Sequence, residues 1–408
     1  MARHYSTRDF FRQMPNVLLA RYFQGRGLLD HLNFTTLKDT QPDELFTAWL
    51  ALPDDKRKGM DSEFQDIFEM SCEKGFRAIL DEAEWHLMRA EPEALAEFVE
   101  SLAALANHYE RAMVTFLDHA SFWKGATLFY HADTLSYWRK RKNLPHQPVA
   151  LDQDSRRDLA DLIRNYFHQT EGRGKNCVVE LLRRGEMDYF FAYPEDYSLQ
   201  SIEWVDGEFG RRPHNPAFEV IFVYSQKEGS LDLNFRGSYK AIEPLQAMFA
   251  AAILKLSDLP PDSKDGRIYD LNPLRQRSFQ FVYDVGSGIQ DVAIKKLRLS
   301  SRVEKGDRIT LEADVSGNRE AIYNLLDKIG VSLPLYNVSQ VELAASVMVA
   351  PDKPLKSVTI RITHPNSCSL KYDELDMKLR EMLVASGIEP RDPTEELATN
   401  EVVEPAEA

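Results

Sequence analysis

The sequence predicts an α+β protein, with a helical N-terminal domain followed by an antiparallel-sheet region that has helices on one face. Through residues 1–150, apolar side chains recur at three- and four-residue steps, and nothing there alternates as a strand does. After Cys177 the apolar period changes to two, and turn-forming residues separate the runs. Hairpin-joined strands are antiparallel, and helices that follow them usually cover one face.

The N-terminal helices are predicted from their starts and stops. Ser6 and Thr7 can cap a first helix, and Pro53 ends a second one that begins at Asp43. The clearest helix begins near Pro92, because proline at the first helical position loses no intrahelical hydrogen bond. Its apolar residues recur as far as Leu117, so we expect one long amphipathic helix there.

The second part repeats a pattern of strands followed by a helix. Hairpin turns are expected around Gln226–Ser230, at Gly286–Gly288 and at Lys305–Asp307. The apolar runs that we predict as strands are 218–224, 231–235, 279–283, 289–299, 309–313, 338–349 and 358–362. Helices are expected from Pro244, over 318–329, and from a cap at Asp373 to Gly387.

These patterns predict four segments along the chain. They are a helical domain (1–150), an α+β domain (158–260), a second α+β domain or a continuation of the same sheet (265–389), and a disordered acidic tail (390–408). From Glu389 onward there are seven acids against a single arginine, with few apolar residues.

Composition and charge limit the cellular compartment and the partners that we expect for this protein. The net charge of −14 over 408 residues argues against non-specific binding of the whole chain to nucleic acid or anionic membrane. The three cysteines are far apart and form no CxxC pair, which favours free thiols in a reducing compartment. The N-terminus lacks a signal-peptide pattern, and the most apolar window (Leu245–Leu256) is too short to span a bilayer. We therefore expect a cytoplasmic protein with no membrane partner.

No standard catalytic motif is present in the sequence. It contains no phosphate-binding loop, dinucleotide fingerprint, nucleophile elbow or zincin motif. His108 and His119 share one helix face, but on a straight helix they would be roughly 16 Å apart, too far to hold one zinc ion. We therefore assign no catalytic residue, no cofactor and no metal ligand.

One basic segment is a candidate for nucleic-acid or anion contact. Between Trp138 and Glu186 there are eleven basic and seven acidic residues, and an aromatic ring beside cations suits a phosphate backbone and a stacked base. Two interpretations without a binding function stay open. The basic segment could be a solvated helix end with a linker, and the glycine-containing stretch 171–176 could be a helix-to-strand connection. The candidate contacts are Trp138, Arg139, Lys140, Arg141, Lys142, Arg156, Arg157, Arg173 and Lys175.

Three functional hypotheses follow. The first is a non-catalytic cytoplasmic interaction or regulatory protein that acts with a protein partner. It depends on the two-part architecture, the abundant exposed charge and the lack of a catalytic motif. The alternative is a nucleic-acid-binding protein or regulator that uses the basic segment Trp138–Arg184. The third is an enzyme with an unrecognised site, for which a deep pocket with converging acids or histidines would be the sign.

Overall fold

The fold was analysed in a computed structural model of the chain, which describes residues 4–87, 92–205, 207–262, 268–349 and 354–390. The chain divides into two compact units. The first comprises residues 1–134 with 182–185, and the second comprises 135–181 with 186–408. The predicted acidic tail lies, apart from Pro390, outside the described residues. The predicted segment boundaries at 150, 158 and 265 stay predictions.

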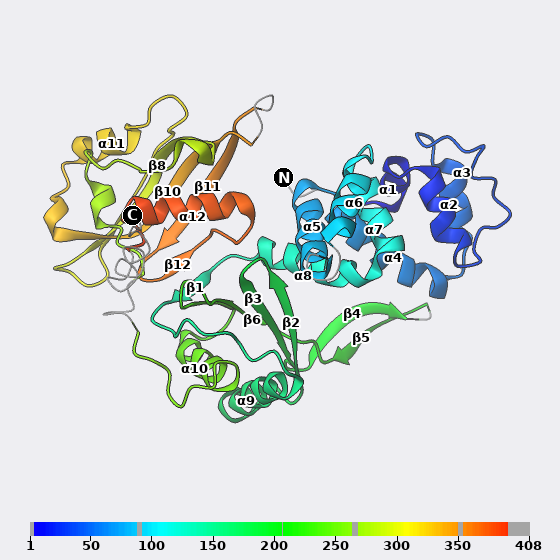
Figure 1. The fold of residues 1–408 in the computed structure, drawn as a ribbon, viewed down its shortest axis with the longest axis horizontal. Coiled ribbons are helices and arrows are strands. Elements are labelled where there is room, and N and C mark those ends of the chain that lie inside the picture. The colour runs from blue at the N-terminus through cyan, green and yellow to red at the C-terminus, as the bar shows by residue number, and fades with distance from the viewer. Residues whose placement is uncertain (1–3, 88–91, 206, 263–267, 350–353, 391–408) are drawn as a thin grey trace, which may run out of the picture. The chain divides into compact units, whose positions relative to one another are not determined.

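The first unit is helical, as the sequence predicts (Figure 1). Its core is rich in aromatic rings, with Phe10, Phe11 and Phe23 packed around Phe64. Ser6 caps the first helix by accepting a hydrogen bond from the backbone N–H of Asp9. The helices are α1 (Thr7–Gln13), α2 (Asn16–Gln24), α3 (Asp43–Leu50), α4 (Asp54–Met70), α5 (Glu73–Leu87), α6 (Pro92–Ala103), α7 (His108–Asp118) and α8 (Ala120–Thr134).

The expected single helix from Pro92 to Leu117 is wrong, because it is broken between α6 and α7. Asn107 begins α7 as its N-cap, where its side-chain oxygen accepts hydrogen bonds from the backbone N–H groups of Tyr109 and Glu110. Such a cap satisfies donors that an uninterrupted helix would pair internally. The apolar period is the same on both sides of the break, so periodicity alone does not reveal it.

The second unit carries a ten-stranded sheet, which is antiparallel throughout from β3 to β9 in the strand order that follows. The strand order is β2-β3-β6-β7-β1-β12-β11-β10-β8-β9. The strands are β1 (Trp138–Arg141), β2 (Cys177–Arg184), β3 (Met187–Pro194), β6 (Val220–Ser225), β7 (Ser230–Phe235), β8 (Ile289–Ser301), β9 (Arg308–Glu312), β10 (Tyr336–Val347), β11 (Lys356–Thr363) and β12 (Ser367–Cys368). A separate two-stranded sheet holds β4 (Leu199–Val205) and β5 (Glu208–His214).

Strand β1 is the link between the two halves of the large sheet. It pairs with β7 on one side, where Lys140 is opposite Asp232, and with β12 on the other, where Trp138 is opposite Cys368. The expectation that nothing in residues 1–150 forms a strand is therefore wrong at residues 138–141, and so is the interpretation of this segment as a solvated helix end with a linker.

Four longer helices cover the sheet: α9 (Gln153–Glu171), α10 (Ile242–Ala252), α11 (Ala321–Ile329) and α12 (Glu374–Ala385). Helices α9 and α10 share an apolar core with the face of β6 and β7 that carries Leu231 and Leu233. Helices α11 and α12 share a second core with β8, β10 and β11. Within each half the helices cover one face, which confirms the predicted α+β class.

Several local predictions are confirmed and one is wrong. Asp373 caps α12 by accepting a hydrogen bond from the backbone N–H of Asp376, and the residues of β6 and β7 form the predicted hairpin. Residues 279–283 do not form a strand. Phe279, Phe281 and Tyr283 instead pack, partly buried, against the core of the second half of the sheet. In the described part of the chain, no helix is both long and apolar enough to cross a lipid bilayer.

Candidate functional site

The basic segment predicted from the sequence lies in the middle of the large sheet. Trp138, Lys140 and Arg141 are buried, whereas Arg139 and Lys142 are half-buried. Alternation along β1 places Lys140 on one face of the sheet and Arg139 and Arg141 on the other. The five residues are therefore adjacent in sequence but do not form one solvent-facing patch.

Lys140 is the centre of a buried ionic cluster. Its side chain is 2% exposed, and its ammonium lies 2.6 Å from Glu228 Oε2 and 3.0 Å from Glu389 Oε1. The ammonium of Lys142 lies 3.1 Å from the same Glu389 oxygen. Glu389 follows α12, so the end of the described C-terminal segment is joined to the central strand.

The same face holds a second part of this cluster. The hydroxyl of Tyr372 donates a hydrogen bond to the carboxylate of Asp232, which is opposite Lys140 in the sheet. Arg380 on α12 donates to the backbone carbonyls of Leu370 and Lys371, each at 2.9 Å, and its guanidinium lies over the Tyr372 ring. Helix α12 thus covers the charged face of β1 and β7.

The charges of this cluster balance. Three cations (Lys140, Lys142 and Arg380) face three acids (Glu228, Asp232 and Glu389). Burial raises the pKa of Glu389, but the charges of Lys140 and Lys142 outweigh this effect and hold the pKa at about 2. Burial also raises the pKa of Asp232, only partly offset by Arg380 and Lys140. A network in which cations and acids neutralise one another, with Lys140, Asp232, Arg380 and Glu389 buried, favours a structural role over a site that binds a charged ligand.

The other predicted contacts are spread over the second unit. Arg141 donates to the Gln246 side chain at 3.1 Å and lies on the α10 side of the sheet. The guanidinium of Arg139 lies over the ring of Tyr239. Arg173 is half-buried and forms ion pairs with Glu171 and Asp196.

Arg156, Arg157 and Lys175 complete the predicted set. Arg156 and Arg157 lie in the first turns of α9, and exposed Arg157 pairs with Asp154. Arg157 and Arg173 are near opposite ends of α9, roughly 24 Å apart at 1.5 Å per residue. Lys175 is exposed in the connection from α9 to β2. Whether any of the nine residues contacts nucleic acid stays a prediction.

A hairpin made of β4 and β5 was not predicted from the sequence (Figure 1). In its register Trp204 is opposite Phe209, and Ile202 is opposite Arg211. Residues that alternate along paired strands share a face, so these four side chains lie on the same side. Their exposed fractions are high: 62% for Ile202, 68% for Trp204 and 63% for Phe209. The rings of Trp204 and Phe209 are 5.3 Å apart between centroids.

A sequence signal for this hairpin does exist. An Asp-Gly dipeptide at positions 206–207 follows a run in which Ile202, Glu203 and Trp204 alternate, and Gly207 has a φ of +78°. Such a dipeptide between alternating runs is a strong short-range indication of a two-residue hairpin turn. It was overlooked because the runs are interrupted by charges that are atypical of a buried strand.

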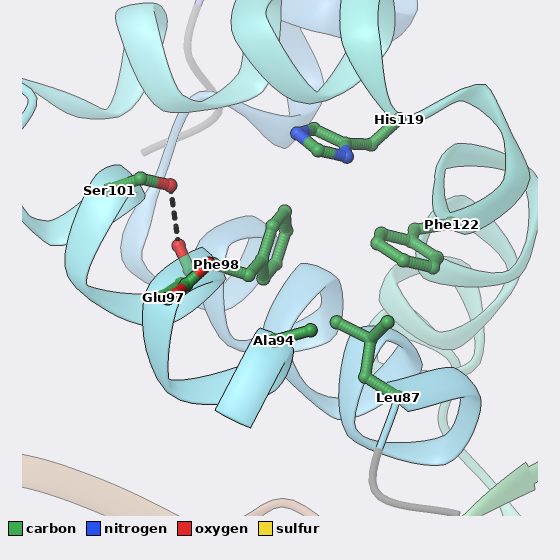
Figure 2. A pocket seen from close by; sticks show the side chains of 7 residues that line it. All are labelled: Leu87, Ala94, Glu97, Phe98, Ser101, His119 and Phe122. Atoms are coloured by element: carbon green, nitrogen blue, oxygen red, sulfur yellow. Dashed lines mark hydrogen bonds between the residues drawn. The ribbon is translucent and has the colours of Figure 1, made fainter. Parts of the chain in front are cut away.

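The first unit contains a pocket of about 350 Å³ (Figure 2). Its walls come from the end of α5, from α6, and from the junction of α7 and α8, where His119 is the residue that caps α7. The lining residues are Leu87, Ala94, Glu97, Phe98, Ser101, His119 and Phe122. Among the described residues, no group of three or more His, Cys, Asp and Glu side chains is placed to hold a metal ion.

No protein-family model and no curated protein matches the sequence of this chain.

Proposed function

We propose that this chain is a non-catalytic interaction protein that binds a protein partner through one face of the β4–β5 hairpin. The observation that supports this proposal is the set of large apolar side chains, Ile202, Trp204 and Phe209, that are exposed together on that face. We name the side of the hairpin that carries Ile202, Trp204, Phe209 and Arg211 the hairpin face. Scattered exposed apolar residues are normal on protein surfaces, but a contiguous group that includes two aromatic rings is typical of a docking site.

The low stability expected of an isolated hairpin supports the proposal that a partner covers it. A two-stranded sheet is marginally stable in water, because too little apolar surface is buried between two strands. Here the apolar face is exposed, although burying one large apolar side chain contributes about 1.5–3 kcal/mol. A partner that covers the hairpin face would supply the missing burial.

The charges of the hairpin indicate the chemistry of the partner. Arg211 is on the hairpin face, whereas the acids Glu203 and Glu208 are on the opposite face. The complementary surface is therefore an apolar patch with a carboxylate placed to meet Arg211. Tryptophan and arginine are the residue types most enriched among side chains that dominate binding energy at protein interfaces.

The hairpin face suits a protein better than a nucleic acid. Affinity for a phosphate backbone depends on several cations, each neutralising a phosphate, whereas this face has one cation beside three apolar side chains. Nucleic-acid binding through the basic segment Trp138–Arg184 remains a separate proposal, and it predicts a strong salt dependence that hairpin docking does not.

The proposal includes a cytoplasmic setting. All three cysteines, Cys72, Cys177 and Cys368, are free thiols, as a reducing compartment favours. Burial raises the pKa of Cys177 to about 12 and also raises the pKa of Cys368. Both thiols are therefore protonated at neutral pH and slow to react.

The test is recovery of a partner with the intact chain and with a Trp204→Ser, Phe209→Ser double variant. A protein partner should co-purify stoichiometrically with the wild type, and its affinity should fall more than tenfold in the double variant, since such anchors contribute about 2 kcal/mol or more each. Val285→Ser is the matched control, because Val285 is an exposed apolar residue elsewhere in the same unit.

The outcomes separate the alternatives. A partner that binds the double variant as tightly as the wild type, measured with the purified components, would overturn docking at the hairpin face. Recovery of nucleic acid in place of protein, with an affinity that falls steeply as salt rises, would favour the nucleic-acid proposal.

A further inference from the structure

The pocket in the helical unit is an open hollow large enough for a small molecule. Its volume of about 350 Å³ is at the lower end of the range for ligand pockets, which are mostly apolar with a few polar groups. Figure 2 shows the rings of His119, Phe98 and Phe122 around the same space, with Leu87 below them. Three flat rings and one aliphatic side chain thus face a volume suited to one ring or a short alkyl group.

The rings are held in place by one another. His119 is stacked on Phe122, with ring centroids 5.7 Å apart, and is edge-on to Phe98 at 4.8 Å. The backbone of His119 is fixed as well, because its N–H donates to the Thr115 carbonyl and its own carbonyl accepts from Phe122. The pocket wall is therefore preorganised, which lowers the entropic cost of binding.

A buried acid supports this wall from behind. The ring of His86 packs on Phe122 with centroids 5.4 Å apart, and His86 Nε2 lies 3.0 Å from Glu82 Oε1. Glu82 is buried, and Gly125 leaves room for its carboxylate, because a Cβ at that position would lie 2.1 Å from Glu82 Oε1.

Two polar groups of the lining have no hydrogen-bond partner for their side chains among the described residues. The Ser101 hydroxyl donates to the Phe98 carbonyl at 2.8 Å, so it is already paired. Within residues 4–87 and 92–205, by contrast, neither the carboxylate of Glu97 nor the imidazole of His119 has a side-chain hydrogen bond or an ion pair. A carboxylate and an imidazole can both accept a hydrogen bond from a ligand.

We infer that this pocket binds a small organic amine whose aromatic or alkyl body enters between His119, Phe98 and Phe122. The faces of aromatic rings attract cations, and the Glu97 carboxylate at the rim adds an opposite charge for the ammonium group. A ligand carboxylate would meet the like charge of Glu97. The rings provide apolar burial, and His119 provides a second acceptor.

The probes for the test share one phenyl ring and differ in the end group: phenethylamine, phenethyl alcohol and hydrocinnamate. Calorimetric titration of the full chain should give the tightest binding for phenethylamine. Glu97→Gln should weaken the amine about fivefold and leave the alcohol unchanged, since an exposed ion pair contributes up to about 1 kcal/mol. Glu93→Gln, an exposed acid on the same helix that does not line the pocket, should have no effect.

A second variant tests the place of binding. Ala94→Leu adds volume to the pocket wall within α6 and keeps a good helix former, so it should abolish binding while the helical circular dichroism signal stays intact. The inference is overturned if phenethylamine does not bind or binds no tighter than the other two probes. It is equally overturned if amine binding is unchanged in Ala94→Leu. None of these outcomes bears on the hairpin face.

Discussion

The ammonium of Lys140 lies 3.0 Å from Glu389 Oε1, although the two residues are 249 positions apart in the chain. Both side chains are 2% exposed. Lys140 is in the central strand of the sheet, and Glu389 is the residue before the last one described. The pair therefore ties the C-terminal helix to the strand that links the two halves of the sheet.

Removing the charge of Lys140 should destabilise the second unit strongly. Lys140→Met leaves the buried Glu389 and the partly exposed Glu228 without their main cation, and losing one partner of a buried pair costs about 3–5 kcal/mol. Urea unfolding followed by circular dichroism measures this free energy. The control is Arg157→Gln, which breaks only an exposed pair with Asp154 and should change stability by less than about 0.5 kcal/mol. Equal effects of the two variants would contradict the buried cluster.

The stability of the second unit should fall in acid. The folded-state pKa of Glu389 is about 2, below the unfolded value of about 4.3. A lowered pKa contributes stability above the unfolded value, and this contribution disappears as the pH falls from about 5 towards 2. Burial raises the pKa of Asp232, so the contribution of this residue to the free energy of unfolding increases as the pH falls.

Unfolding free energies at pH 7, 5 and 3 test this expectation. Glu389→Gln should be less stable than the wild type at pH 7, and the difference should shrink as the pH falls to 3. A difference that stays constant over this range would show that Glu389 is not an ionised partner of Lys140.

Gly125 should be intolerant of a side chain. In Gly125→Ala the new Cβ would collide with the Glu82 carboxylate, which cannot move freely because it is buried and paired with His86. Overpacking of this kind costs about 1–3 kcal/mol, more than the gain of up to about 1 kcal/mol in helix propensity. Gly59 is the matched control, since it is also within a helix but has no atom within 4 Å of its ideal Cβ. Gly59→Ala should stabilise the helical unit by up to about 1 kcal/mol through helix propensity. Thermal unfolding of both variants measures whether each substitution lowers or raises the stability of the helical unit.

The β4–β5 hairpin should open more readily than the large sheet. Its two strands bury little apolar surface, whereas every residue of β6 and β7 is buried. Local opening is easiest where few buried contacts must be broken. Hydrogen–deuterium exchange should therefore be faster for peptides from 199–214 than for peptides from 220–235. Equal protection in the isolated protein would mean that the hairpin face is already covered.

Elements with their own local signals were predictable from the sequence. The cap at Asp373 and the β6–β7 hairpin are each indicated by the residue types of a short stretch of sequence. Both are present where the sequence predicts them. The two apolar faces of β6 correctly indicated a central strand.

Elements that depend on distant partners were not predictable. Strand β1 has four residues, three of them basic, and it becomes a strand only because β7 and β12 pair with it. Glu389 was counted with the acids of the tail, since nothing near it in sequence indicates that Lys140 and Lys142 neutralise it. Counting charge along the chain cannot show which cations are enclosed.

The position of β1 also bears on how the protein is made. During synthesis β1 leaves the ribosome early, but β12 and Glu389 are translated more than two hundred residues later. Until then β1 has an unpaired edge on one side, and Lys140 lacks one of its two main partners. Contacts between such distant segments slow folding, and open strand edges favour aggregation. The second unit should therefore complete its sheet only after residue 389 has left the ribosome, and until then the open edge of β1 is exposed to wrong pairing.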